Sequence, residues 1–176
     1  MNEKEYGKRL VEEMILEQLM ESFPRITGRS VTEEADGAFA QVEGSPDFIV
    51  GLDGRALGIE LAEIRDAEDG NAYLGEASRL AWRKHESYER RGLIRNPIAL
   101  ILHSTAIPLF DIQRELTATS LGEFEEVGFV EVWCVDFSDA HYSTQDPRRP
   151  ADMFCFKPKD WFGFHRIGWW DRKPFG

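Results

Sequence analysis

Two apolar runs separated by a short polar turn lie near the middle of the first hundred residues. The runs are Phe48–Val50 and Ala56–Ile59, and the turn between them contains Asp53 and Gly54. Asp-Gly between apolar runs favours a two-residue hairpin, because both central positions of a type I′ turn need a positive φ angle. The pattern therefore predicts two antiparallel strands, the second of which extends to about Ile64.

Apolar residues at helical spacing lie before and after this hairpin. Residues 3–22 repeat apolar positions at the i, i+3, i+4, i+7 spacing, which predicts a helix that Pro24 ends. Its stripe consists of Tyr6, Leu10, Val11, Met14, Ile15, Gln18 and Leu19. Residues 72–91 predict a second helix, and Gly92 is a suitable C-cap for it. The polar, glycine-containing residues 25–37 predict a loop.

The remaining apolar runs predict strands and one further helix. Ala38–Val42 predicts a short first strand, and the almost continuous apolar run Pro97–Leu102 predicts a central strand buried on both faces. Because the second helix separates this strand from the hairpin, the strand is expected to pair in parallel. Residues 108–120 predict a helix, Phe129–Phe137 predicts a strand, and irregular chain is expected from Ser138 onward.

Composition indicates a globular protein with one domain over residues 1–176. Apolar residues make up 42% of the chain and charged residues 30%, so a sizeable core is expected. The sequence has no apolar run of membrane-spanning length, and its charged N-terminus lacks the apolar core of a signal peptide. We therefore expect a cytoplasmic protein without membrane contact, in which Cys134 and Cys155 are buried free thiols.

The C-terminal region is distinguished by its aromatic density. Its aromatic residues within Met153–Trp170 are Phe154, Phe156, Trp161, Phe162, Phe164, Trp169 and Trp170. One interpretation is a packed extension over the sheet. The alternative is a surface for base stacking or for a partner, because Arg166, Arg172 and Lys173 lie among the aromatic residues.

The net charge of −11 is unevenly distributed. Residues 1–70 hold 17 acidic and 7 basic side chains, whereas residues 71–176 hold 15 acidic and 14 basic ones. An acidic protein repels nucleic acid at long range, which argues against broad non-specific DNA binding and leaves a local basic surface as the alternative. Basic residues gather on and beyond the second helix, at Arg79, Arg83, Lys84, Arg90, Arg91 and Arg95.

Two carboxylates belong to the predicted hairpin. Asp47 opens its first strand and Glu60 lies near the middle of its second, so counting back from the turn places them close together on the ladder. A carboxylate inside an apolar strand is costly unless a partner compensates its charge, and a metal ion is one such partner. Regular alternation directs Glu63 to the other side of the strand.

This arrangement resembles the PD-(D/E)XK nuclease superfamily. Pro46-Asp47 matches the first half of the superfamily motif, and Glu60-Leu61-Ala62 stands at the second half, with Ala62 at the position of the motif lysine. The order helix, three strands, helix, strand over about residues 3–104 matches the superfamily core. The resemblance implies an α/β fold with a restriction-endonuclease-like core and a mixed central sheet, to which residues 105–176 add a helix, a strand and the C-terminal extension.

The resemblance also implies roles for individual residues. Asp47 and Glu60 would be catalytic residues that bind Mg²⁺ or Mn²⁺, and Glu13 or Glu17 of the first helix would add an acid to the metal site. Lys84 is the preferred substitute for the motif lysine, with Arg79 or Arg83 as alternatives. The alternative structural roles are a solvated charged face for the glutamates and, for the basic residues, stabilisation of the helix C-terminus.

Two functions follow from these expectations. The first is metal-dependent hydrolysis of phosphodiester bonds in DNA or RNA. The second is a catalytically silent relative that binds a protein or a nucleic acid. The four histidines show no zinc-ligand spacing, and His103 is expected at the surface, with a position beside a cleft at the end of the central strand as the alternative.

Overall fold

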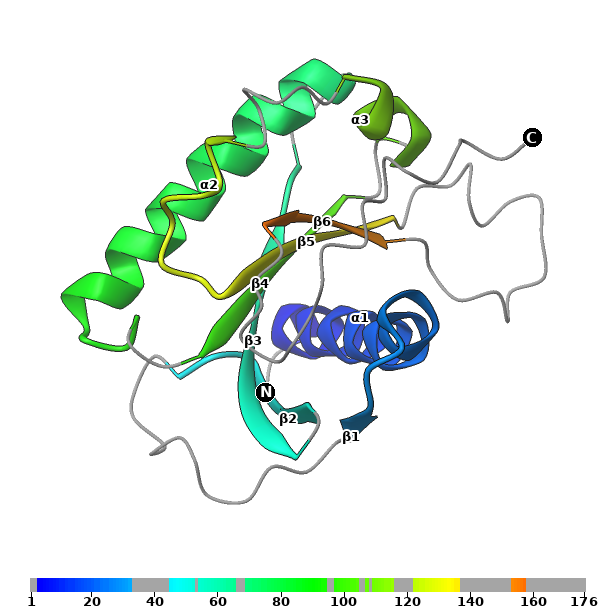
Figure 1. The fold of residues 1–176 in the computed structure, drawn as a ribbon, viewed down its shortest axis with the longest axis vertical. Helices are drawn as coiled ribbons and strands as arrows, with labels where there is room; N and C mark the ends of the chain where they lie inside the picture. The colour runs from blue at the N-terminus through cyan, green and yellow to red at the C-terminus, as the bar shows by residue number, and fades with distance from the viewer. Residues whose placement is uncertain are drawn as a thin grey trace.

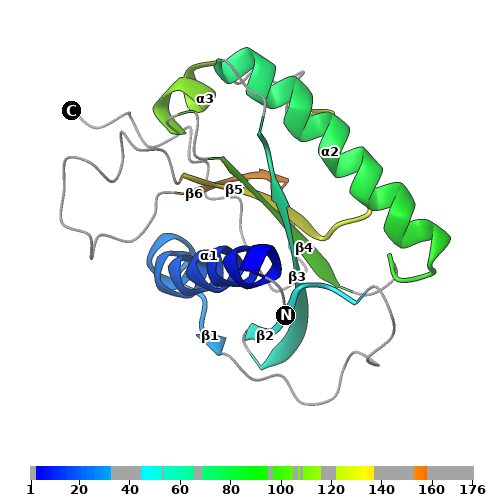
Figure 2. The same cartoon turned by 180° about the vertical axis from the view of Figure 1, so that it is seen from behind.

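The protein folds into an α/β arrangement around a mixed six-stranded sheet. The computed structural model describes residues 3–32, 45–52, 54–65, 69–94, 97–104, 107, 109–115, 122–136 and 153–157. The elements are α1 (Glu3–Thr27), β1 (Val31–Thr32), β2 (Phe48–Leu52), β3 (Arg55–Glu63), α2 (Gly70–Arg90), β4 (Ile98–Ser104), α3 (Leu109–Glu115), β5 (Glu131–Asp136) and β6 (Met153–Lys157). The strands follow one another in sequence order across the sheet, and α1 and α2 lie on opposite faces of it (Figure 1, Figure 2).

The predicted hairpin is confirmed. β2 and β3 pair antiparallel from Phe48 opposite Ile59 to Leu52 opposite Arg55, which leaves a two-residue turn between them. Gly54 has a φ angle of 77°, as the turn requires. Its partner in the turn, Asp53, lies outside the described residues.

The predicted parallel pairing of the central strand is also confirmed. β4 pairs in parallel with β3 on one side and with β5 on the other, while β6 closes this edge antiparallel to β5. Every residue of β4 is buried. His103 was expected at the surface, but it is only 7% exposed, because β4 continues through Ser104 and its last residues are flanked by both neighbouring strands.

Each face of the sheet carries its own apolar core. On the α2 face, Tyr73, Ala77, Leu80 and Tyr88 of the helix pack with alternate residues of the strands, among them Ala62, Leu100, Leu102 and Val132. On the α1 face, Ile15, Leu19 and Phe23 pack with the intervening residues, among them Val50, Ile59, Leu61, Ile101 and Trp133. The period of two along each strand thus divides the strand residues between the two cores.

Helix α1 begins at the predicted residue, but it ends later than predicted and buries only part of the predicted stripe. Pro24 does not end the helix, which continues to Thr27 and closes with a bond from the Gly28 N–H to the Pro24 carbonyl at 2.8 Å. Phe23 is 4% exposed and meets the ring of Trp133 edge-on at 5.3 Å, so packing holds the chain helical beside the proline. The predicted apolar stripe is buried at Ile15 and Leu19, whereas its N-terminal residues are exposed.

Other boundaries shift for similar reasons. The predicted loop over 25–37 contains β1, which pairs with the end of β2, and the predicted irregular chain after Ser138 contains β6. Neither strand has a strong pattern of its own, because each depends on pairing with a neighbour. The predicted strand Ala38–Val42 and most of the aromatic C-terminal extension lie outside the described residues. Both cysteines are buried free thiols, as predicted.

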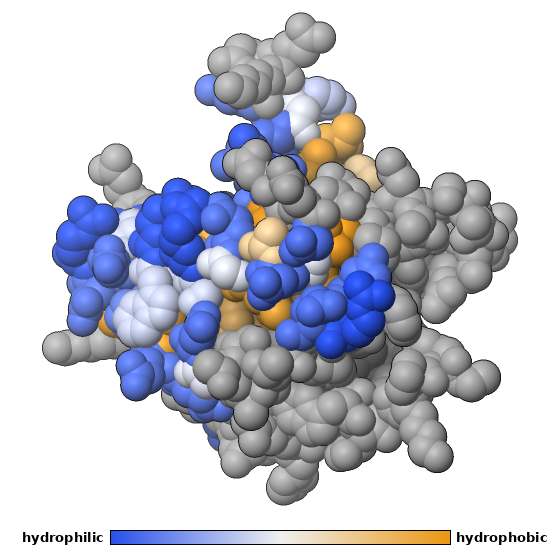
Figure 3. Space-filling model, turned by 90° about the horizontal axis from the view of Figure 1, so that it is seen from above, coloured by the Kyte–Doolittle hydropathy of each residue, from blue (hydrophilic) through white to orange (hydrophobic). Residues whose placement is uncertain are grey.

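The face of the molecule seen in Figure 3 is mainly polar where it can be described. In the view of Figure 3, hydrophilic side chains cover most of the coloured surface, with smaller apolar areas between them. None of the helices in the described ranges combines the length and the apolar character that crossing a bilayer requires.

Candidate functional site

The position of Asp47 is set by a contact between a proline and a glycine. A Cβ atom on Gly58 would lie 2.7 Å from Pro46 Cγ, closer than real Cβ contacts allow, and a tight 3.2 Å from Ile98 Cγ1. The missing side chain of Gly58 therefore lets Pro46 pack directly on β3. Asp47 follows Pro46 and directly precedes β2, so the contact of Pro46 with β3 fixes its position.

Asp47 extends the hairpin register by one position and lies next to Glu60. Its Oδ2 accepts a hydrogen bond from the Leu61 N–H at 2.8 Å. Because β2 begins only at Phe48, this carboxylate takes the place that a further β2 residue would fill in the ladder. The Asp47 side chain is exposed, so it can contact solvent or a ligand while holding this bond.

Glu60 lies on the α2 face of β3, where its side chain is only 8% exposed. Lys84 Nζ forms an ion pair with Glu60 Oε1, and the Tyr88 hydroxyl donates to Glu60 Oε2. Lys84 and Tyr88 are one helical turn apart, so α2 presents both donors on one side. The cost of burying this carboxylate is therefore met by the protein itself, and charge-assisted bonds of this kind are strong.

The surroundings of Tyr88 keep its hydroxyl in the donor form. Burial raises the pKa of Tyr88, and the bond to Glu60 raises it further. The Tyr88 ring meets Phe129 edge-on at 5.8 Å, and the Arg91 guanidinium lies over it at 4.5 Å from the ring centroid. The tyrosine is thus fixed between the core and the basic end of α2.

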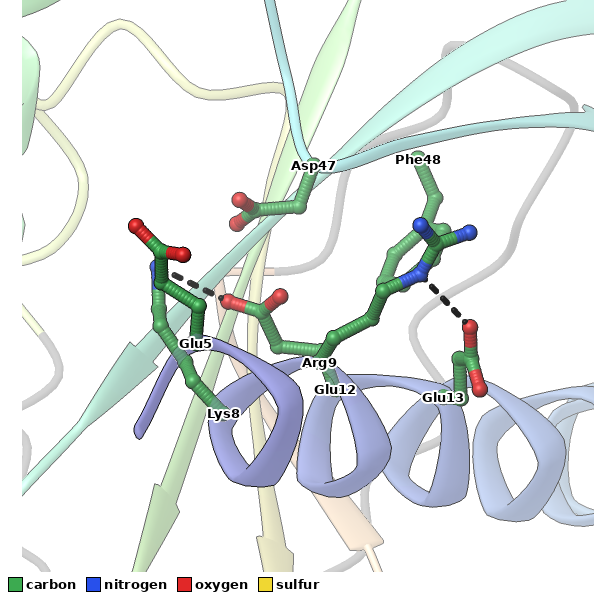
Figure 4. A pocket seen from close by; sticks show the side chains of 7 residues that line it. All are labelled: Glu5, Lys8, Arg9, Glu12, Glu13, Asp47 and Phe48. Atoms are coloured by element: carbon green, nitrogen blue, oxygen red, sulfur yellow. Dashed lines mark hydrogen bonds and ion pairs between the residues drawn. The ribbon is translucent and has the colours of Figure 1, made fainter. Parts of the chain in front are cut away.

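A cavity of about 350 Å³ lies between α1 and the start of β2. Its lining consists of Glu5, Lys8, Arg9, Glu12, Glu13, Asp47 and Phe48. In Figure 4, Asp47 is directed toward α1, whose charged side faces it. Lys8 pairs with Glu12 at 3.1 Å and Arg9 with Glu13 at 3.0 Å, each one helical turn apart. Such exposed pairs are weak, so an incoming charged ligand could displace either one.

The acids around Lys8 favour its protonated form. Its pKa is raised, first by the hydrogen bond and charge of Glu12 and then by the charges of Asp47 and Glu60. Lys8 lines the cavity together with Asp47, which turns toward α1, whereas Glu60 turns toward Lys84 and Tyr88 of α2. Sequence reasoning missed Lys8 and Glu12, because the direction in which α1 presents its charges depends on how the helix packs.

The predicted site residues are brought together only in part. Asp47, Glu60 and Lys84 lie around the start of β2, with Lys84 on the side of α2. Glu13 lines the cavity but pairs with Arg9, whereas Glu17 is exposed and does not line it.

The group of Asp47, Glu60 and Lys84 does not include the two basic alternatives to Lys84 or the second acid of β3. Arg79 pairs with Glu76 at the surface of α2, and Arg83 is exposed. Glu63 pairs with Arg65 at 2.6 Å.

His103 is a further titratable group near this end of the sheet. Burial lowers its pKa to about 4, with the charges of Glu63 and Asp47 acting in the opposite direction. The imidazole is therefore neutral at pH 7.

The carboxylates fit a divalent cation in type and number of ligands. Mg²⁺ is commonly held by one or two carboxylates, with water and phosphate oxygens completing the shell. Asp47 and Glu60 supply that number, but they are directed toward different helices, Asp47 toward α1 and Glu60 toward α2. No group of three or more His, Cys, Asp or Glu side chains suited to a metal ion occurs within the described ranges. A cation at Glu60 would also compete with Lys84 for the carboxylate.

Comparisons of the chain with protein-family models, curated proteins and solved structures gave no match.

Proposed function

We propose that this protein is a metal-dependent hydrolase of nucleic-acid phosphodiester bonds, built on a restriction-endonuclease-like core. The observation that carries the proposal is the position of Asp47 and Glu60, which occupy neighbouring positions on the hairpin, with Asp47 at a cavity that Lys8 and Arg9 also line. The order helix, three strands, helix, strand and the mixed sheet support the same core.

The acids have distinct roles in this proposal. Asp47 and Glu60 would hold Mg²⁺ or Mn²⁺, which when bound supplies a Lewis acid and lowers the pKa of water. Asp47 keeps its orientation through the Leu61 N–H, so one of its oxygens remains directed by the backbone. Glu60 is held in place by Tyr88.

Cations of both helices would handle the substrate. Lys84 lies beside Glu60, where Ala62 has no charge to offer, and it would orient the attacking water. Lys8 and Arg9 line the cavity and would exchange their glutamate partners for phosphate oxygens. Phosphate is the stronger anion for such cations, because it carries more acceptor oxygens than one carboxylate.

A cleavage assay with the full chain tests the proposal. Labelled single- and double-stranded DNA and RNA are incubated with the protein in Mn²⁺ or Mg²⁺. Asp47→Asn keeps an oxygen for the Leu61 N–H but loses the charge, so cleavage should fall at least about a hundredfold, or about 3 kcal/mol of transition-state stabilisation.

The matched control is Glu17→Gln, which removes one carboxylate charge from an exposed position of α1 outside the cavity. It should cleave like the wild type. Equal cleavage by the Asp47→Asn variant and the wild type would contradict the proposal, as would a metal-independent rate.

A silent binding module is the second candidate, and one observation favours it. Both oxygens of Glu60 already have protein partners, so the buried carboxylate needs no metal ion to compensate it. Calorimetric titration with Mn²⁺ separates the candidates. The hydrolase should bind Mn²⁺, and Lys84→Met should bind it more tightly because a competing cation is gone. Absence of binding at millimolar Mn²⁺ in both proteins favours the silent module.

A further inference from the structure

The first half of α1 turns its charged side toward the protein and its apolar side toward solvent. Its charged side, with Lys8 and Glu12, faces the cavity and Asp47. Its apolar side chains are exposed to solvent. Tyr6 is 59% exposed, Leu10 47%, Val11 49% and Met14 51%. We define these four residues as the α1 stripe.

The α1 stripe forms one continuous surface. Tyr6, Leu10 and Met14 are successive i, i+4, i+8 positions, so they lie one above another along the helix, and Val11 lies beside them. Gly7 lies on the same side, and a Cβ added to it would meet nothing within 4 Å. Large apolar side chains gathered in this way commonly mark a docking surface.

The rim of the stripe is acidic. Glu17 lies three residues after Met14 and Glu21 one turn further, and both are exposed. A second copy of the chain would bring the same acids against one another, which is unfavourable. The surface therefore selects an apolar occupant that carries positive charge.

One segment of this chain has that chemistry. Residues 158–176 lie outside the described residues and carry Trp161, Phe162, Phe164, Ile167, Trp169, Trp170 and Phe175. Their four basic and two acidic side chains give a net charge of +2, while the whole chain carries −11, so residues 1–157 carry −13. The segment is thus attracted to the rest of the chain.

The segment is also long enough. It follows Lys157 in β6, and Cys155 of that strand belongs to the same core as Ile15 and Leu19 of α1. Nineteen residues reach about 60 Å when extended, whereas the 25 residues of α1 measure about 37 Å at the helical rise. We propose that the aromatic, basic segment 158–176 docks on the α1 stripe of its own chain.

Hydrogen exchange of the full chain, read by mass spectrometry, tests this docking. Amides of residues 161–170 should exchange on the order of tenfold more slowly than in the free peptide of that sequence. Leu10→Glu and Met14→Glu each place a charge on the stripe and should abolish that protection, while exchange in β3 and β4 stays unchanged. Arg90→Glu, the matched control at an exposed position of α2, should preserve it.

A reciprocal measurement reads the other side of the contact. Trp169→Ala combined with Trp170→Ala should expose Met14 and speed its oxidation by peroxide several-fold, measured on the peptide that contains it. Free-peptide exchange of 161–170 in the wild type would overturn the proposal. Protection that survives both stripe variants would overturn it too, as would a wild-type dimer that Leu10→Glu converts to a monomer.

Discussion

Within the described ranges, the sheet buries two carboxylates, one on each face, and the protein treats them differently. Glu131 of β5 lies on the α1 face and is 1% exposed, with Arg29 at 2.9 Å and the Trp133 Nε1–H donating at 2.8 Å. Glu60 of β3 lies on the α2 face, and its cation Lys84 is 31% exposed. Glu131 is thus sealed together with its cation, whereas the cation of Glu60 reaches solvent.

This difference separates a structural ion pair from a candidate site. Burial raises the pKa of Glu131, with Arg29 and Trp133 acting against it. Neither of the two ion pairs lines the charged cavity. Glu60 has its cation at the surface and Asp47 beside it. A buried charge alone therefore does not indicate function, but a buried charge with an exchangeable partner does.

The largest effect is expected when the sealed pair is broken. Arg29→Met leaves Glu131 buried without its cation and should lower the free energy of unfolding by about 3–5 kcal/mol. The loss of unfolding free energy should grow as the pH rises. The reason is that a carboxyl group whose pKa is raised in the folded protein favours the folded state only while it is protonated. Urea unfolding at pH 5 and pH 8 measures both.

The control for that variant is the double change Arg29→Met with Glu131→Gln. It removes the charge while the new amide oxygen still accepts from Trp133, so most of the lost stability should return. A double variant as unstable as Arg29→Met would show that Arg29 acts through packing, for instance on the Phe23 ring below it.

The pH dependence of folding stability tests whether His103, at the end of β4, is shielded from water as Glu131 is. The pKa of His103 is about 4 in the folded protein and 6.5 in an unfolded chain, so the unfolded chain takes up the proton first. Folding stability should therefore be intact above pH 6.5 and be lost as the pH falls toward 4, by about 3 kcal/mol in total. His103→Gln should remove this component of the unfolding free energy between pH 7 and 4.5. An unchanged pH slope would mean that water reaches the imidazole.

The smallest effect is expected at the open pair. Lys84→Met leaves Tyr88 as a donor to Glu60 and lets water approach, so the loss should be about 1–2 kcal/mol. Urea unfolding beside Arg29→Met measures the contrast directly. Equal losses in the two variants would remove the distinction between the faces.

Local patterns predicted much of this fold. The Asp53-Gly54 turn set the hairpin register, and with it the closeness of Asp47 and Glu60. The spacing of α2 placed Lys84 and Tyr88 on one side of the helix. These features depend on neighbours in sequence or on one turn.

Features that depend on packing escaped prediction. The helix runs past Pro24 because Phe23 is anchored on Trp133. The exposure of Leu10 and the approach of Lys8 to Asp47 follow from how α1 lies on the sheet. The sequence predicted Glu13 or Glu17 for the site and not Glu12, because helical spacing alone does not say which charged side of α1 faces the sheet.

The close contact of Pro46 with Gly58 depends on the absence of a Cβ atom at residue 58. An alanine at this glycine position keeps the strand conformation but occupies the space into which the proline ring fits. The ring would have to retreat, and the neighbouring aspartate would retreat with it from the backbone of β3. Redesign of this sheet can therefore vary many apolar side chains, but the Asp47 end of the hairpin depends on an atom that is absent.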